Sequence, residues 1–121
     1  MPSYRSGLEK EAAKKLRRYK YEPEGFEYTV RKKYWPDFVK GDIWIEVKGR
    51  FRNSEEAAKY IHIRNCWPSK RLVFLFQNPE TPMPGAKKRK DGSKYTVSQW
   101  ARDNGFEWAT LETIGDRLRH V

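Results

Sequence analysis

The sequence predicts an α/β domain in which helices flank a mixed β-sheet. Short apolar or alternating runs at 26–30, 43–48 and 71–76 have the length and pattern of β-strands. Serine or threonine followed three residues later by glutamate or glutamine occurs at Ser6 and at Thr96, which is the capping-box signal for the start of a helix. A Gly-Asp pair at 41–42 between two apolar stretches indicates a β-hairpin.

The N-terminal part of the chain predicts one helix and one strand. We expect the helix over about 6–19, because Leu8, Ala12, Leu16 and Tyr19 follow each other at helical spacing. Pro23 blocks further helix, and the alternation of apolar and polar residues over 26–30 is typical of a strand. With 121 residues, the chain is expected to be a single domain, 1–121.

The stretch 36–48 predicts a hairpin of defined register. With Gly41 and Asp42 as the loop, Phe38 pairs with Ile45, and Asp37 lies opposite Glu46. Lys48 points to the same face, since side chains alternate along a strand. The other face is expected to be the core; it carries Phe38, Ile43, Ile45 and Val47.

The remaining elements follow from local signals. Ser54 opens a second helix, and Pro68 lies just past its end. The apolar run 71–76 predicts a buried strand, parallel to its neighbour across that helix. A proline-rich loop spans 78–96, and a third helix starts at Thr96 and stops at Gly105. The alternating stretch 106–111 predicts an edge strand, and the tail predicts a short last helix.

Composition favours a polyanionic partner. Lys and Arg number 26 against 16 Asp and Glu, a net charge of +10, and neutralising phosphates would release counterions. Aromatic residues make up 15% of the chain, too many for a disordered protein. One cysteine excludes an intramolecular disulfide, and no Cys/His cluster suits structural zinc. No apolar run approaches a membrane span, and we expect a cytoplasmic protein.

The hairpin face with Asp37, Glu46 and Lys48 is a candidate catalytic centre. Like charges opposite each other destabilise a sheet, and a divalent cation between them would reverse that effect. Mg²⁺ is typically held by one or two carboxylates together with phosphate oxygens and water. A nearby lysine could position the attacking water or stabilise developing negative charge. The alternative is a solvated hairpin face with a Lys–Glu pair.

Five motifs resemble those of a known family. They are RSGLE at 5–9, WPDF at 35–38, IEVKG at 45–49, IR at 63–64 and WARDNGF at 100–106. In this order, over nearly the whole chain, they resemble phage T7 endonuclease I and its relatives, the Holliday-junction resolvases of the PD-(D/E)xK nuclease superfamily. The resemblance implies a restriction-endonuclease-like core and Mg²⁺-dependent cleavage of four-way and branched DNA, with Mn²⁺ expected to substitute.

The resemblance also implies a homodimer, in the cytoplasm of the host cell, whose subunits exchange their N-terminal parts. The helix at about 6–19 would be exchanged, and residues 26–34 would form the bridge between subunits. Two active sites related by symmetry would suit paired cuts across a junction.

The resemblance assigns the site residues by position. Glu9, Asp37, Glu46 and Lys48 match catalytic positions, and the metal would be held by Asp37, Glu46 and the backbone carbonyl of Val47. The residues alone allow Glu9 to be a helix-capping side chain instead. Glu22 or Glu24 is a possible additional acid, of which Glu22 better matches the local pattern, with a surface glutamate as the alternative.

Several basic residues are candidate DNA contacts. Arg5 and Ser6 lie at a helix N-terminus, a natural phosphate site, and the match at 63–64 favours Arg64. The other candidates are two basic runs: Arg31, Lys32 and Lys33, and Lys87, Lys88, Arg89 and Lys90. The first run could also be a solvated turn, and the second a mobile basic loop.

Two other functions stay open at this point. One is a restriction- or nicking-type endonuclease that cuts ordinary duplex DNA. The other is a non-catalytic basic DNA-binding module, in which the acidic residues are structural.

Overall fold

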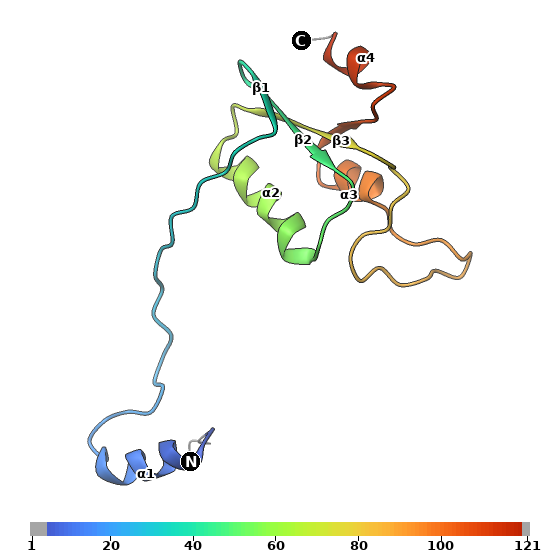
Figure 1. The fold of residues 1–121 in the computed structure, drawn as a ribbon. Helices are drawn as coiled ribbons and strands as arrows, with labels where there is room; N and C mark the ends of the chain where they lie inside the picture. The colour runs from blue at the N-terminus through green and yellow to red at the C-terminus, as the bar shows by residue number, and fades with distance from the viewer. Residues whose placement is uncertain (1–4, 120–121) are drawn as a thin grey trace. The chain divides into compact units, whose positions relative to one another are not determined.

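The computed structural model describes residues 5–119, and the chain divides into two compact units. The first unit comprises residues 1–32 and the second comprises residues 33–121. The second unit contains the sheet and most of the helices (Figure 1). The prediction that 1–121 forms a single nuclease domain stays a prediction.

A four-stranded mixed sheet organises the second unit. Its order is β1 (Phe38–Lys40), β2 (Ile43–Lys48), β3 (Arg71–Phe76) and β4 (Glu107–Ala109). β1 and β2 are antiparallel, and the β2–β3 and β3–β4 pairs are parallel. Phe38 pairs with Ile45 and Lys40 with Ile43, so the predicted hairpin register is confirmed. Gly41 occupies the turn with φ +58°, a conformation that glycine adopts without strain.

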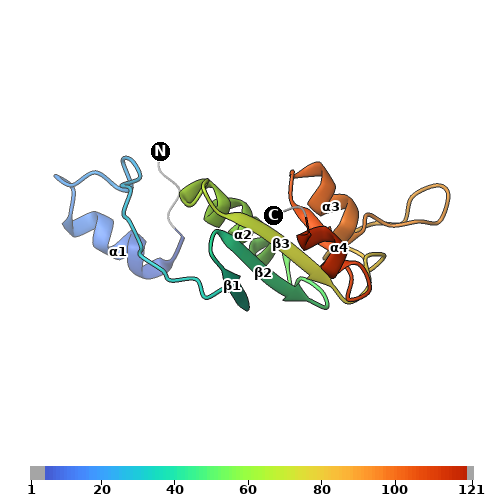
Figure 2. The same cartoon turned by 90° about the horizontal axis from the view of Figure 1, so that it is seen from above.

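Helices flank this sheet, as predicted. α2 (Ser54–Cys66) connects β2 to β3, and α3 (Val97–Asp103) precedes β4 (Figures 1 and 2). Asn53, not Ser54, caps α2 by accepting a hydrogen bond from the Glu56 backbone N–H. Thr96 and Gln99 form the predicted capping box of α3, and α4 (Ile114–Leu118) is the predicted last helix.

The core lies between α2, α3 and the β3 face that carries Phe74 and Phe76. Both of these side chains are fully buried, as is Tyr60 of α2. Phe51 is buried beside them and meets the rings of Tyr60, Phe74 and Trp100 at centroid distances of 4.9–5.9 Å.

The predicted core face of the hairpin is confirmed for Ile43, which is buried, but it is wrong for Phe38 and Val47. Phe38 and Val47 are 62% and 42% exposed, whereas Glu46 is 6% exposed. The parallel register explains this result, because it places Glu46 beside Phe74 and Lys48 beside Phe76. The carboxyl group of Glu46 therefore shares the sheet face on which α2 and α3 pack.

The first unit contains α1 (Gly7–Lys15), which is shorter than the predicted helix over about 6–19. Its nine residues are all described, and none of them is buried. Lys14, Lys15, Arg17 and Arg18 would repel one another at helical spacing, and no packing offsets that repulsion. The helix consequently ends at Lys15, with Leu16 as its C-cap.

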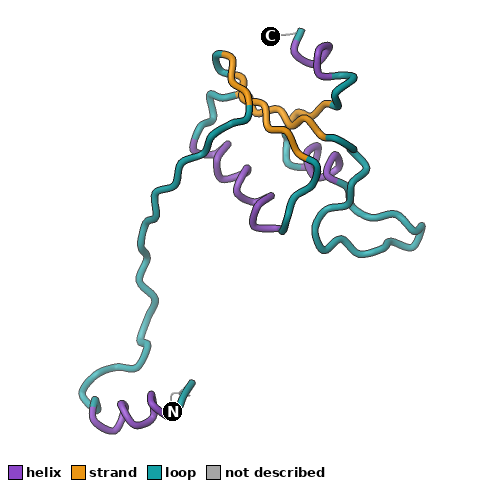
Figure 3. Tube along the Cα trace, viewed as in Figure 1, coloured by secondary structure: helices purple, strands orange, loops and turns teal. Residues whose placement is uncertain are grey.

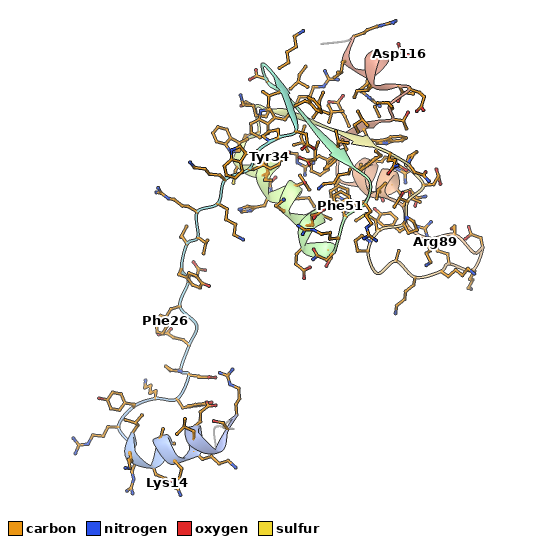
Figure 4. All side chains as sticks on the ribbon, viewed as in Figure 1. Lys14, Phe26, Tyr34, Phe51, Arg89 and Asp116 are labelled. Carbon is orange, nitrogen blue, oxygen red and sulfur yellow. The ribbon has the colours of Figure 1, made fainter. Side chains whose placement is uncertain are left out.

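The strand predicted over 26–30 is absent from the described part of the chain, and Figure 3 shows loop there. A strand needs a partner to satisfy its backbone groups, and sequence alternation cannot supply one. Phe26 and Tyr28 are 77% and 87% exposed, and Figure 4 shows the Phe26 side chain on this extended segment. Among residues 5–119, no helix is long and apolar enough to cross a membrane.

Candidate active site

The hairpin brings Asp37, Glu46 and Lys48 to one face. Asp37 lies one residue before β1, and its Oδ2 accepts a hydrogen bond from the Val47 backbone N–H at 2.8 Å. The Lys48 ammonium lies 3.7 Å from Glu46 Oε2. Asp37 is exposed, while the side chains of Glu46 and Lys48 are 8% and 17% exposed. One solvent-facing carboxylate thus stands beside a buried carboxylate that is paired with a half-buried ammonium.

Tyr34 fixes the other oxygen of Glu46. Its hydroxyl donates to Glu46 Oε1 at 2.5 Å, and its ring packs against Trp44 and Tyr60. The residue lies just before Trp35, Pro36 and Asp37, where the chain enters the hairpin (Figure 4). Sequence analysis did not identify Tyr34, because a side chain three residues before Asp37 follows no strand or helix spacing.

Lys48 has a second carboxylate partner that sequence analysis also missed. Glu56, in the first turn of α2, lies 3.2 Å from the ammonium. The ammonium also lies 5.2 Å from the centroid of the Tyr60 ring. The acidic residues 55 and 56 indicated only a helix start, and nothing in the sequence distinguishes the buried one from its exposed neighbour.

Burial and neighbouring charge shift the protonation of these groups. Burial raises the pKa of Glu46, and the Asp37 carboxylate raises it further, against the opposing effects of Tyr34 and Lys48. Burial lowers the pKa of Lys48, but contacts with Tyr60, Glu56 and Glu46 outweigh it, so the net shift is upward. Lys48 is therefore a cation at neutral pH. In this form it can stabilise negative charge.

The carboxylates of Asp37 and Glu46 fit a divalent cation. A buried carboxylate beside a second one carries a repulsion that a bound cation would relieve. Mg²⁺ typically binds one or two protein carboxylates, and this face offers two. Within residues 5–119, no cluster of three or more acidic, histidine or cysteine side chains gathers around a common point.

The first unit gathers a separate group of predicted site residues. Ser6 accepts a hydrogen bond from the Glu9 backbone N–H at 3.1 Å, which is the capping interaction. The Glu9 carboxylate also accepts a hydrogen bond from the Tyr21 hydroxyl, and Glu22 forms an ion pair with Arg5. Glu9 is thus both a cap residue and part of a polar cluster with the turn at 21–22.

Glu22 has an unusual backbone conformation. Its φ is +42°, and it is the one non-glycine residue with positive φ among those described. Such a conformation costs roughly 1–3 kcal/mol and tends to occur at functional sites. This observation favours a functional role for Glu22 over that of a plain surface glutamate. Its role as an additional acid stays a prediction.

A comparison with protein families agrees with the five motifs found in the sequence. The family model for phage endonuclease I matches residues 1–115. The chain belongs to the phage endonuclease I family. The resemblance found in the sequence is confirmed, and membership makes this protein a nuclease with DNA as its substrate. No curated protein matches the chain.

The basic residues of this phage endonuclease differ in their contacts within the protein. Arg31, Lys32 and Lys33 are exposed. Arg5 forms an ion pair with Glu22. Arg64 of α2 makes two contacts within the protein. The Arg64 guanidinium lies 4.3 Å from the Phe106 ring centroid and donates to the Asn104 carbonyl. These contacts account for Arg64 without DNA, and its contact with phosphate stays a prediction.

The loop over 78–96 is built around hydrogen bonds of its own. Pro82 and Thr96 form a β-bridge at its base, and the Met83 N–H donates to the Tyr95 carbonyl at 2.8 Å. At its tip, the Arg89 N–H donates to the Ser93 carbonyl at 2.7 Å. The hairpin face with Asp37, Glu46 and Lys48 is the candidate active face. The loop begins beside it, since the Gln77 N–H donates to the Lys48 carbonyl at 3.0 Å. Its exposed cations are Lys87, Lys88, Arg89, Lys90 and Lys94.

The raised pKa of Glu46 predicts a pH-dependent effect of Glu46→Gln on stability. Because the pKa of Glu46 is higher in the folded state, this group contributes stability below its unfolded-state pKa. That contribution is lost as the pH rises through its folded-state pKa. Glu46→Gln should therefore unfold at a higher temperature than the wild type at pH 7 without divalent cations. This advantage should shrink toward pH 4, as measured by thermal unfolding in EDTA.

Glu55→Gln is the matched control, since Glu55 is exposed and its substitution removes the same charge. It should not reproduce this pH-dependent difference. A wild type that is at least as stable as Glu46→Gln at pH 7 would contradict the buried repulsion.

The loop predicts a change in the salt dependence of DNA binding. Replacing Lys88 and Lys90 by glutamate should flatten the plot of log K against log[salt], because each lost phosphate contact removes a slope of about 0.9. Replacing Arg117 of α4 and Arg119, its C-cap residue, by glutamate changes the net charge equally and is the control. Equal slopes for the two double variants, measured by fluorescence anisotropy, would show that the loop does not bind phosphate.

Proposed function

We propose that this nuclease is a Mg²⁺-dependent, structure-selective DNA endonuclease that resolves four-way junctions and other branched DNA. The main supporting observation is the hairpin face, where the Lys48 ammonium lies 3.7 Å from buried Glu46 and Asp37 is exposed. Membership of the phage endonuclease I family supports the proposal. The mixed sheet and its antiparallel hairpin support the proposal of a PD-(D/E)xK core.

Asp37, Glu46 and the backbone carbonyl of Val47 would hold the cation, with Mn²⁺ expected to substitute. When bound, it would polarise the phosphodiester and lower the pKa of an attacking water. Asp37 is oriented for this role by its hydrogen bond to the Val47 N–H, and Glu46 by Tyr34. Lys48 would donate hydrogen bonds to the water or to a phosphate oxygen and stabilise negative charge there.

DNA binding would depend on charge distributed over the rest of the chain. The net charge of +10 favours the phosphate backbone, and the exposed loop cations lie on a segment that starts next to Lys48. Contacts to phosphates report the shape of the DNA more than its base sequence. Selectivity for branched DNA would then follow from the arrangement of the strands.

We propose further that the protein is a dimer whose subunits exchange their N-terminal parts. None of the α1 residues is buried, and Leu8 is 81% exposed. The segment 26–30 exposes Phe26, Tyr28 and Val30, and the hairpin exposes Phe38 and Val47. Exposed apolar surface of this kind marks interaction sites. In the dimer, Glu9 of one chain would join the hairpin carboxylates of the other, and residues 26–34 would connect the subunits.

The proposed chemistry predicts separation of cleavage from binding. Asp37→Asn, Glu46→Gln and Lys48→Ala should each abolish cleavage of a four-way junction in Mg²⁺, because each removes a group from the hairpin face. Junction affinity without metal should stay close to wild type, since these residues are a small part of the basic surface. Gel assays would compare a four-way junction with linear duplex of the same sequence, with and without Mg²⁺.

Each alternative has its own outcome in that assay. Cleavage of linear duplex at the same rate as the junction would identify a restriction- or nicking-type enzyme. Binding with no cleavage by the wild type would identify a non-catalytic module. A hairpin variant that cuts at the wild-type rate would refute the assignment of that residue.

The exchanged dimer predicts how two lesions combine. A heterodimer of a Glu9→Gln chain and a Lys48→Ala chain should keep about half of the wild-type cleavage capacity, because one composite site carries both lesions and the other carries none. If Glu9 acts within its own chain, each site carries one lesion and the heterodimer is inactive. Purification through two different tags isolates the heterodimer, and a monomer in sedimentation would reject the exchange.

A further inference from the structure

Lys48 has carboxylate partners on two different elements. Glu46 belongs to the same strand, β2, and lies 3.7 Å from the ammonium, whereas Glu56 belongs to α2 and lies 3.2 Å away. The Tyr60 ring covers another side of the ammonium at 5.2 Å. The closer carboxylate is therefore the one outside the hairpin.

The Glu56 carboxylate is itself held in place. Its Oε1 faces Lys48, and its Oε2 accepts a hydrogen bond from Arg52 Nε at 2.8 Å. Its backbone N–H donates to Asn53 Oδ1, the N-cap of α2. The side chain is 8% exposed, compared with the exposed Glu55 beside it. The start of α2 thus presents one fixed carboxylate oxygen to the active face.

A cation on the hairpin face would affect the two carboxylate partners of Lys48, Glu46 and Glu56, differently. A divalent cation between Asp37 and Glu46 would share the charge of Glu46 and would repel the nearby Lys48 ammonium. Glu56 does not lie on the hairpin, so its charge would remain available to Lys48. Without Glu56, the half-buried ammonium would lose its closer counter-ion when a second positive charge binds beside it.

We infer that Glu56 is a positioning residue that holds the Lys48 ammonium in place while the hairpin carboxylates engage the metal. This inference rests on the proposed function of the hairpin face. Glu56 acts through Lys48 and does not touch the DNA or the cation. Its loss should affect the rate of the chemical step and leave substrate binding unchanged.

Glu56→Gln tests this role with an isosteric side chain. Its kcat for junction cleavage in Mg²⁺ should fall about 10- to 100-fold, the usual effect of removing a partner that orients an active-site group. KM and metal-free junction affinity should stay within about twofold, because binding is not involved. Glu55→Gln, which removes the same charge from the same helix turn, should cleave like the wild type.

The outcomes separate this inference from the proposed function. A wild type that does not cleave DNA in Mg²⁺ or Mn²⁺ would refute the function itself. A wild type that cleaves, together with a Glu56→Gln variant indistinguishable from Glu55→Gln, would overturn the role of Glu56 alone. An equal loss in both variants would also overturn it, since that result would report a general effect of charge on α2.

A measurement on the wild type covers the case in which Glu56→Gln does not fold. The ¹⁵N NMR signal of the Lys48 ammonium, assigned by its loss in Lys48→Ala, should be detectable because the group is buried and paired. It should persist when Mg²⁺ is added without DNA. Disappearance of the signal on addition of Mg²⁺ would show that Glu56 does not retain the ammonium and would overturn the inference.

Discussion

The carboxyl group of Glu46 lies on the core side of the sheet, and the active face is arranged around it. Burial without partners would be costly for such a group, so the fold surrounds it with the Tyr34 hydroxyl and the Lys48 ammonium. The parallel pairing of β2 with β3 places it there, since that register aligns Glu46 with Phe74. The proposed cation site and the hydrophobic core therefore share one face of the sheet, and α2 borders both.

The N-terminal unit has the opposite character. α1 buries none of its residues, and the segment that follows exposes aromatic side chains that would be unfavourable to leave in water. Its order comes from polar contacts between the turn at 21–22 and the start of α1. None of the described residues of this unit, 5–32, is buried, so they form no core of their own. This is the physical reason for proposing that a second subunit covers it.

Local signals in the sequence predicted much of the second unit. Gly41 and Asp42 fixed the hairpin register, and the apolar run at 71–76 identified β3 with its bounds. The same signals could not show which hairpin face is buried, because that depends on where α2 and α3 pack. They also predicted a strand at 26–30 that has no partner within the described chain. Tyr34 and Glu56 reach the site through tertiary packing, which leaves no spacing pattern in the sequence.

The charge of this nuclease is distributed unevenly, and this distribution can separate DNA binding from the chemical step. The net charge is +10, yet the active face combines three carboxylates, Asp37, Glu46 and Glu56, with the cations Lys48 and Arg52. The excess of positive charge must therefore lie elsewhere, including the exposed loop that begins beside Lys48. A locally acidic centre repels phosphate until a cation neutralises it, whereas the exposed basic residues can attract DNA without a cation bound there. Binding and chemistry can thus depend on separate residues of one small chain.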